Sequence, residues 1–243
     1  AVAAALSEAG EGVFAIVATA GTTNFGIVDK LDEISKVAKE SNIWFHVDGA
    51  YGLAGLAHEE TRKLFAGVEK ADSFIIDPHK WLFAPYDVCA LIYRNSEIGR
   101  EAHTQHAGYL DALTESDEFN PSDYAIQLTR RTRGLPLWFS LAAHGTKAYS
   151  DAVAKTMETA RMAADLVKAH PNLELLREPN LSIVAFTRKG WAMPDYKKWS
   201  DKLLEDQIGF VTPSTHKGEP ILRFAIVNPW TNVSDIEAIL ATL

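Results

Sequence analysis

Cysteine is almost absent from this chain of 243 residues, since Cys89 is the only one. An internal disulfide is therefore impossible, a zinc site built from several thiolates is excluded, and we predict no metal. The 24 lysines and arginines are outnumbered by 32 aspartates and glutamates, a formal balance of −8. This balance argues against a nucleic-acid partner and against an anionic membrane surface, because both require a basic patch.

Long apolar runs are also missing. No stretch approaches the roughly 18 apolar residues that span a bilayer, and the first residues lack the pattern of a signal peptide. We therefore expect a soluble protein of the cytoplasm that contacts no membrane. The chain begins AVAAAL, without an initiator methionine and in what reads as the middle of a helix. We interpret it as a fragment or a processed piece.

Strand and helix signals alternate over the first hundred residues, and 47% hydrophobic residues suffice for a sizeable core. Short apolar runs at 14–18, 43–47 and 73–76 read as strands, while residues after Asp29 and residues 59–66 show helical spacing. This order predicts an α/β fold with a mostly parallel sheet. Residues 89–93 follow too soon for a helical crossover, so we expect them to pair antiparallel.

The second half of the sequence has a different pattern. Residues 95–133 read as a long polar loop, and a long helix begins at Pro136 with only a mild break at Gly145. Short strands at 173–176, 182–186 and 221–227 then alternate with helices at 195–206 and 234–243. We divide the chain into part of a large domain (1–135), a linking helix (136–160) and a small α+β domain (161–243).

Chemically useful side chains follow successive strands: Thr23, Asp48, and the pair His79 and Lys80. The carboxyl ends of strands in an open α/β sheet are where ligands bind, so we expect these residues to converge. A lysine amine can form an imine with an aldehyde, and a carboxylate can hold a ring nitrogen protonated, as pyridoxal 5'-phosphate requires. Taken singly, the lysine reads as a surface residue, the aspartate as a helix cap and the histidine as structural.

Three segments carry a family resemblance: IVATAGTTNFGIVDKLDEI, IWFHVDGAYG and ADSFIIDPHKWLFAPYD. They resemble the group II pyridoxal-phosphate-dependent amino-acid decarboxylases, which include aromatic-amino-acid, glutamate and diaminobutyrate decarboxylases. The likeness continues through LTRRTRGLPLWFSLAAHG and LRFAIVNP. It implies the fold type I of PLP-dependent transferases, with residues 1–135 as the C-terminal part of the large cofactor-binding domain.

The resemblance also implies roles for individual residues. Lys80 would hold the cofactor as a Schiff base, Asp48 would form a salt bridge with the pyridine nitrogen, and Thr23 would contact the cofactor. Ala50 would pack against one face of the ring, and His79 would lie near the imine and the phosphate as a catalytic residue. Two further positions follow from the same likeness: a polar cofactor contact for Asp77 and a place in the substrate pocket for Tyr86.

A mobile-loop tyrosine protonates the carbanion in that family, after carbon dioxide has left. Tyr109 and Tyr124 are the candidates in this sequence, although the expected position falls nearer to Phe119–Pro121. A phenylalanine at that place is associated in related enzymes with oxidative deamination. The protonating residue therefore stays open.

The predicted function is decarboxylation of an L-amino acid to the amine and carbon dioxide. The alternatives are another reaction of the same fold (aldehyde synthase, aminotransferase or carbon–sulfur lyase) or a non-catalytic half that acts as a scaffold. The family's N-terminal half is missing, so we expect a complementary N-terminal polypeptide and a dimer of complete subunits. For Arg223, inside an apolar strand, we expect a structural ion pair in preference to carboxylate binding.

Overall fold

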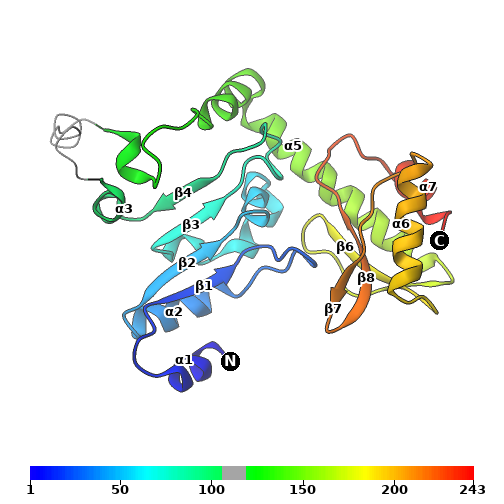
Figure 1. The fold of residues 1–243 in the computed structure, drawn as a ribbon, viewed down its shortest axis with the longest axis horizontal. Helices are drawn as coiled ribbons and strands as arrows, with labels where there is room; N and C mark the ends of the chain where they lie inside the picture. The colour runs from blue at the N-terminus through cyan, green and yellow to red at the C-terminus, as the bar shows by residue number, and fades with distance from the viewer. Residues whose placement is uncertain (106–118) are drawn as a thin grey trace.

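The computed structural model describes residues 1–105 and 119–243, arranged as two parts joined by a long helix (Figure 1). The first part contains a sheet in the order β1 (Ala15–Thr19), β2 (Trp44–Asp48), β3 (Ser73–Ile76) and β4 (Ala90–Tyr93). Strands β1, β2 and β3 are parallel, and β4 pairs antiparallel with β3. The predicted mostly parallel sheet with an antiparallel last strand is thus confirmed.

Helices cover one side of this sheet. Helix α2 (Leu31–Glu40) packs against β1 and β2, and its first turn carries two acidic residues that suit the positive end of the helix dipole. Three 3-10 helices follow β2: η1 (Gly52–Ala57), η2 (Glu59–Phe65) and η3 (Val68–Lys70). The helix predicted over 59–66 is therefore a 3-10 helix. A short helix, α1 (Val2–Ala9), precedes the sheet.

The two faces of the parallel sheet differ sharply. Ala18, Phe45 and Val47 point to one face and are buried in a cluster with side chains of α2 and η1. On the other face, Val17 in β1 is 63% exposed and Leu91 in β4 is 44% exposed. The described residues therefore cover one face of the sheet and leave the other open.

The stretch predicted as a loop over 95–133 contains more structure than expected. Helix α3 (Ser96–His103) begins after Asn95, whose side chain accepts a hydrogen bond from the Glu97 N–H. The 3-10 helix η4 (Pro121–Tyr124) packs against α3, and the buried Asp123 lies 3.4 Å from the Arg100 guanidinium. The N-terminal cap of α3 was a readable signal that the polar composition masked.

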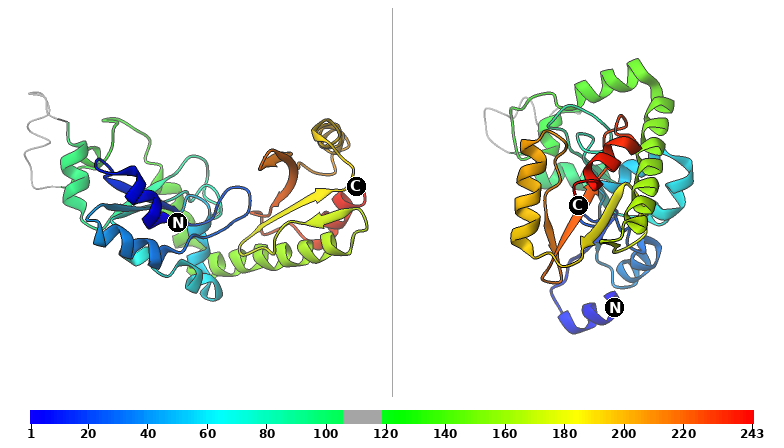
Figure 2. Two further views of the ribbon diagram at one scale, coloured as in Figure 1. Left: turned by 90° about the horizontal axis from the view of Figure 1, so that it is seen from below. Right: turned by 90° about the vertical axis from the view of Figure 1, so that its right-hand side faces the viewer.

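Helix α5 (Gly134–Ala169) connects the two parts and runs along one side of both (Figure 2). It is interrupted at Gly145, where φ is 73° and ψ is 160°, so the break is a full kink instead of the mild one expected. Beyond the kink, Val153 and Met157 pack in the core of the first part. Ala160 to Val167 pack in the core of the second. Among the described helices, none is long and apolar enough to cross a bilayer.

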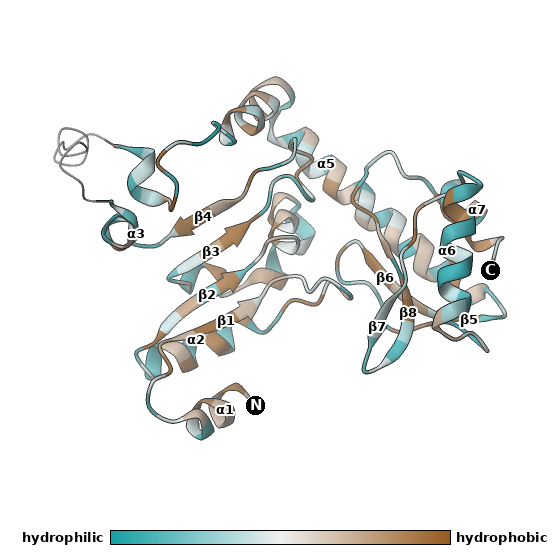
Figure 3. Ribbon diagram, in the orientation of Figure 1, coloured by the Kyte–Doolittle hydropathy of each residue, from teal (hydrophilic) through white to brown (hydrophobic). Residues whose placement is uncertain are grey.

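The second part is an antiparallel sheet with helices on one side. Its strand order is β5-β6-β8-β7, where the strands are β5 (Leu173–Leu175), β6 (Ile183–Arg188), β7 (Ser214–His216) and β8 (Glu219–Ala225). Helices α6 (Met193–Glu205) and α7 (Val233–Leu240) complete it. The apolar strands and the polar outer side of α6 are visible in Figure 3. Strand β7 was not predicted, because three residues are too few for a periodic signal.

Candidate active site

Three loops meet at the carboxyl edge of the parallel sheet, held by main-chain hydrogen bonds. The Ala20 N–H donates to the Asp48 carbonyl at 2.7 Å, which ties the loop after β1 to the end of β2. The Asp77 N–H donates to the Ala50 carbonyl at 3.0 Å, which ties the loop after β3 to the same segment. The predicted convergence of the strand ends is therefore observed in the backbone.

Glycine allows the first two of these loops to touch. Gly21 has φ of 107°, and a Cβ atom placed on it would lie 2.6 Å from the Gly52 Cα. Any side chain at Gly21 would clash with this neighbouring backbone, and its φ lies in the left-handed region that favours glycine. The loop that carries Thr23 consequently lies directly against the turn that follows Asp48.

Asp48 is the last residue of β2 and is partly buried. One carboxylate oxygen accepts a hydrogen bond from the Ala50 N–H at 3.1 Å. Among the described residues, no lysine, arginine or histidine nitrogen lies within 4.0 Å of this carboxylate. A partly buried charge of this kind is stabilised by a cation, and the residues that the structure describes supply none within 4.0 Å.

Lys80 lies in the turn after β3 and pairs with Asp77. The Lys80 Nζ is 2.8 Å from the Asp77 Oδ2, and the lysine side chain is 44% exposed. The Lys80 N–H donates to the Asp77 carbonyl at 2.9 Å, so the turn itself places the two side chains together. The amine is thus accessible at the edge where Asp48 ends its strand.

The ring of His79 is fixed by the segment before β4. The His79 Nδ1 lies 2.6 Å from the Val88 carbonyl and 3.2 Å from the Val88 N–H, so the Val88 backbone contacts this nitrogen in either tautomer. In the neutral ring one of the two nitrogens carries the proton and the other keeps a lone pair. Tyr86 is exposed, and its ring meets the His79 ring edge to face at 4.9 Å. His79 and Tyr86 are therefore in contact.

The two threonines after β1 have different surroundings. The Thr22 hydroxyl accepts a hydrogen bond from the Ile27 N–H at 3.1 Å, which closes the turn. Thr23 is exposed, and its carbonyl accepts a hydrogen bond from Arg223 Nη1 at 3.0 Å. The expected ion pair of Arg223 is wrong: no carboxylate of the described residues lies within 4.0 Å of it, and a main-chain carbonyl satisfies the guanidinium instead.

The second part of the molecule also holds the loop that carries Thr23. The Asn24 amide donates to the Thr215 carbonyl at 3.3 Å and accepts from the Ser214 hydroxyl at 3.3 Å. The Phe25 ring meets the ring of His216 edge to face at 4.7 Å. Because strand β7 was not predicted, these contacts could not be read from the sequence.

Tyr51 is a structural residue at the site that the sequence reading missed. Its ring stacks on Trp81 at 5.1 Å, and its hydroxyl lies 2.6 Å from the Ser182 Oγ and accepts from the Ser182 N–H at 3.0 Å. Burial, opposed only in part by the hydrogen bonds to Ser182, raises the pKa of Tyr51 to about 12. Tyr51 therefore remains a neutral link between the two parts. Its position three residues after Asp48 was the available signal.

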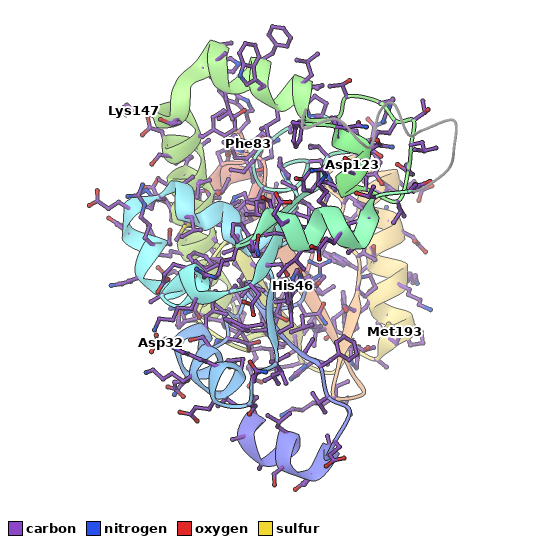
Figure 4. The ribbon with its side chains drawn as sticks, turned by 90° about the vertical axis from the view of Figure 1, so that its left-hand side faces the viewer. Asp32, His46, Phe83, Asp123, Lys147 and Met193 are labelled. Atoms are coloured by element: carbon purple, nitrogen blue, oxygen red, sulfur yellow. The ribbon has the colours of Figure 1, made fainter. Side chains whose placement is uncertain are left out.

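His46 stands on the open face of the sheet, two residues before Asp48 (Figure 4). Its Nδ1 lies 2.7 Å from the Ser73 hydroxyl. Burial lowers its pKa, and the nearby charge of Asp48 only partly opposes that effect. A neutral histidine on this face was not predicted.

A cavity of about 840 Å³ borders the site and is lined by His79, Cys89, Asn120–Ser122 and Leu128–Gly134, among others. Asp87 forms ion pairs with Arg131 and Arg133 at its wall. Tyr124 belongs to η4 and stacks on Phe119 at 5.4 Å, and it does not line this cavity. Tyr109 lies outside the described residues.

Residues 2–189 match the model of the pyridoxal-dependent decarboxylase conserved domain. The chain belongs to this family. It is 30% identical over 244 residues to the aromatic-L-amino-acid decarboxylase of Bacillus atrophaeus, covering 95% of this chain and 50% of that protein. It is 30% identical to the 3,4-dihydroxyphenylacetaldehyde synthase of Aedes aegypti, covering 91% of this chain and 43% of that one.

The fold is also that of the family. The crystal structure of Oryza sativa TDC with PLP and tryptamine superposes with a TM-score of 0.87 at 26% identity, over 99% of this chain and 52% of that one. The predicted α/β architecture of fold type I is confirmed. The chain thus spans about half the length of the relatives it matches.

The residues at the carboxyl edge fit pyridoxal phosphate. Lys80 offers an accessible amine that can bind an aldehyde, and a protonated pyridine nitrogen would give the partly buried Asp48 carboxylate the cation that residues 1–105 and 119–243 do not supply. These are complementary requirements of one ligand. Pyridoxal phosphate is accordingly the cofactor of this family.

Proposed function

We propose that the complete protein decarboxylates an L-amino acid to the corresponding amine and carbon dioxide. The observation that supports this proposal is the arrangement of Lys80 and Asp48 at one sheet edge, tied together by the hydrogen bond from the Asp77 N–H to the Ala50 carbonyl. When bound, pyridoxal phosphate would supply the conjugated, protonated ring that stabilises the electron pair left behind by carbon dioxide.

The roles of the side chains follow from their chemistry. Lys80 would bind the cofactor's aldehyde, and Asp48 would keep the ring nitrogen protonated by electrostatic attraction. Thr23, in the loop after β1, and Ala50, in the turn that follows Asp48, would contact the cofactor. His79, with Nδ1 held by Val88, would move a proton at Nε2.

Tyr86 supports this arrangement as a candidate for the substrate pocket, because its exposed ring touches His79. Tyr109 and Tyr124 remain the candidates for the residue that returns a proton to carbon. The stacking of Tyr124 on Phe119 would have to open before its hydroxyl could serve that purpose.

We propose that a complementary N-terminal half completes the enzyme, that complete subunits form a dimer, and that the protein acts in the cytoplasm. Two observations support the missing half: the chain spans 50% of its Bacillus relative, and one face of the parallel sheet exposes Val17 and Leu91. Parallel sheets in stable proteins are covered on both faces. A second layer of helices would bury these side chains.

Replacement of Lys80 tests the function directly. In the complete protein, Lys80→Ala should abolish the visible absorbance of the lysine-bound cofactor and reduce turnover by several orders of magnitude. Lys189→Ala, far from the sheet edge in sequence, is the control that should keep both. A Lys80→Ala protein that retained absorbance and turnover would refute the proposal.

An oxidative reaction that yields an aldehyde is the second candidate. It is favoured by the similarity to the Aedes aegypti aldehyde synthase and by Phe119 near the place expected for the protonating tyrosine. Incubation of the complete enzyme with the common L-amino acids would separate the two reactions. Carbon dioxide without ammonia or hydrogen peroxide indicates simple decarboxylation, while all three products indicate the aldehyde synthase.

A further inference from the structure

Asp77 is the direct partner of the reactive lysine. Its carboxylate is 14% exposed, and its Oδ2 lies 2.8 Å from the Lys80 Nζ. Both ends of the pair are fixed by backbone hydrogen bonds, from the Asp77 N–H to Ala50 and from the Lys80 N–H to Asp77. The ion pair is therefore part of the turn after β3 and not a chance surface contact.

Cys89 lies across the β3–β4 pairing from the same carboxylate. Ile76 pairs with Ala90 in the antiparallel register of β3 and β4, so the next positions outward, Asp77 and Cys89, face each other. The Asp77 carboxylate accordingly raises the pKa of the exposed Cys89 thiol, and the thiol in turn lowers the pKa of Asp77. Sheet pairing thus brings the only cysteine of the chain to this carboxylate.

The ionisation of Asp77 follows from these contacts. Burial alone would raise the pKa of this carboxyl, but the hydrogen bonds from Lys80 and Cys89 outweigh it and hold the pKa below its usual value. The positive charge that His79 can carry acts in the same direction. Asp77 is consequently ionised at neutral pH and suits the role of a counter-ion better than that of a proton acceptor.

We propose that Asp77 is a positioning residue that holds the Lys80 amine at the sheet edge as an ion pair, with Cys89 fixing the orientation of the carboxylate. This inference rests on the proposed function of Lys80, and it assigns Asp77 to the amine in place of the cofactor contact predicted from sequence. The aldehyde of pyridoxal phosphate would have to displace the pair in order to react.

Lys80 needs no further reagent to bind the aldehyde of the cofactor. The Lys80 ammonium first releases a proton to solvent, since only the neutral amine attacks an aldehyde carbon. With the cofactor bound, the Lys80 nitrogen would form a double bond to that carbon, and the aldehyde oxygen would leave as water with the two remaining amine protons. The pair with Asp77 stabilises the charged amine, so it slows this step while it keeps the nitrogen in place.

Chemical labelling of the isolated chain tests the ion pair. The chain is treated with pyridoxal phosphate, reduced with borohydride and digested, and labelling of Lys80 is measured against the other lysines. Asp77→Asn should speed Lys80 labelling about two- to five-fold at neutral pH, the range expected for a partly exposed pair. Asp77→Glu retains the charge and should stay near the wild type.

A matched control removes another pair with the same spacing. Asp165 lies 2.7 Å from Lys168 three residues later, and Asp165→Asn should leave Lys80 labelling unchanged. Lys80 labelling that is no faster in Asp77→Asn than in the wild type would overturn the proposal. The same holds if Asp77→Glu behaves like Asp77→Asn, because the effect would then be structural. Unfolding midpoints of all variants establish that they are folded.

Alkylation of Cys89 with iodoacetamide tests the second contact. Desolvation raises the pKa of the Cys89 thiol from an ordinary 9.0 to about 11, with further contributions from Asp77 and, more weakly, from the charge of Asp48. The positive charge of Lys80 acts in the opposite direction. The thiolate is the reactive form, so the rate should rise with pH well beyond 9. Asp77→Asn should move the midpoint towards 9, and an unchanged midpoint contradicts the contact.

These measurements separate the inference from the proposed function. They need neither turnover nor a complementary half, whereas the Lys80→Ala experiment uses the complete enzyme. A labelling change together with full cofactor absorbance in Lys80→Ala would keep the ion pair and reject the decarboxylase. Unchanged Lys80 labelling in Asp77→Asn, together with loss of cofactor absorbance in Lys80→Ala, would reject only the role of Asp77.

Discussion

The two sheets of this chain differ in how far their apolar faces are covered. In the antiparallel sheet, β6 and β8 bury Val184, Phe186, Leu222 and Phe224 against α6, α7 and the end of α5. In the parallel sheet, Val47 on one face is fully buried while Val17 on the other is largely exposed. In Figure 1 the parallel sheet lies near the start of helix α5 and the antiparallel sheet near its end.

This difference indicates which part of the chain needs a further layer of protein. Residues from Ala160 onward enclose a core among themselves, so the second part satisfies its own apolar surface. The parallel sheet has only one covered face, and the candidate site lies at its carboxyl edge. We infer that folding of the second part is autonomous, whereas the chemistry of the first part requires a further layer of protein.

The largest expected effect is in the closed core of the second part. Leu222 is 0% exposed and stands opposite Phe186 across the sheet. Leu222→Ala should lower the free energy of unfolding by about 2–5 kcal/mol, because it removes buried contacts and leaves a cavity. Urea unfolding measures the loss. Leu204→Ala, at an exposed position of α6, should change it by less than about 0.5 kcal/mol.

An intermediate effect is expected at the contact between the two parts. Tyr51→Phe removes the hydroxyl that accepts from the buried Ser182 N–H, and leaving that donor unpaired should cost about 1–3 kcal/mol. Unfolding followed separately by fluorescence and by circular dichroism would show whether the parts still unfold together. Unchanged stability and coincident transitions would mean that Tyr51 does not couple them.

The smallest effect is expected on the open face of the parallel sheet. Val17→Ser should change the stability of the isolated chain by no more than about 0.5 kcal/mol, because the side chain is already largely in water. Val47→Ser, on the covered face of the neighbouring strand, should be far more destabilising in the same urea titration. Equal losses for both variants would show that the two faces are equally buried.

Most of the fold could be predicted from local patterns of apolar residues. The apolar runs that became β1, β2 and β3 were readable because buried parallel strands are continuously hydrophobic, and the short gap before β4 excluded a helical crossover. Strand β7 was not predicted because it has too few residues for a periodic signal. Helix α3 was not predicted because it lies in a polar stretch, although Asn95 caps its N-terminus. The family resemblance of the segments around Asp48 and Lys80 was specific enough to indicate the cofactor.

Contacts between distant segments could not be read in the same way. The partner of Arg223 was predicted as a carboxylate, yet it is the carbonyl of Thr23, 200 residues earlier. Cys89 had no signal of its own, because its contact with Asp77 depends on the register of two strands.

Residue order alone decided the sheet type and the family, and it predicts Lys80 as the reactive lysine, since these depend on periodicity and on short spacings within one chain segment. The folded structure alone decided which side chains Asp77, Thr23 and Tyr51 touch, and which face of the parallel sheet stays open. The physical reason is that hydrogen bonds and burial form between segments that chain order separates, and only the packed structure fixes their distances.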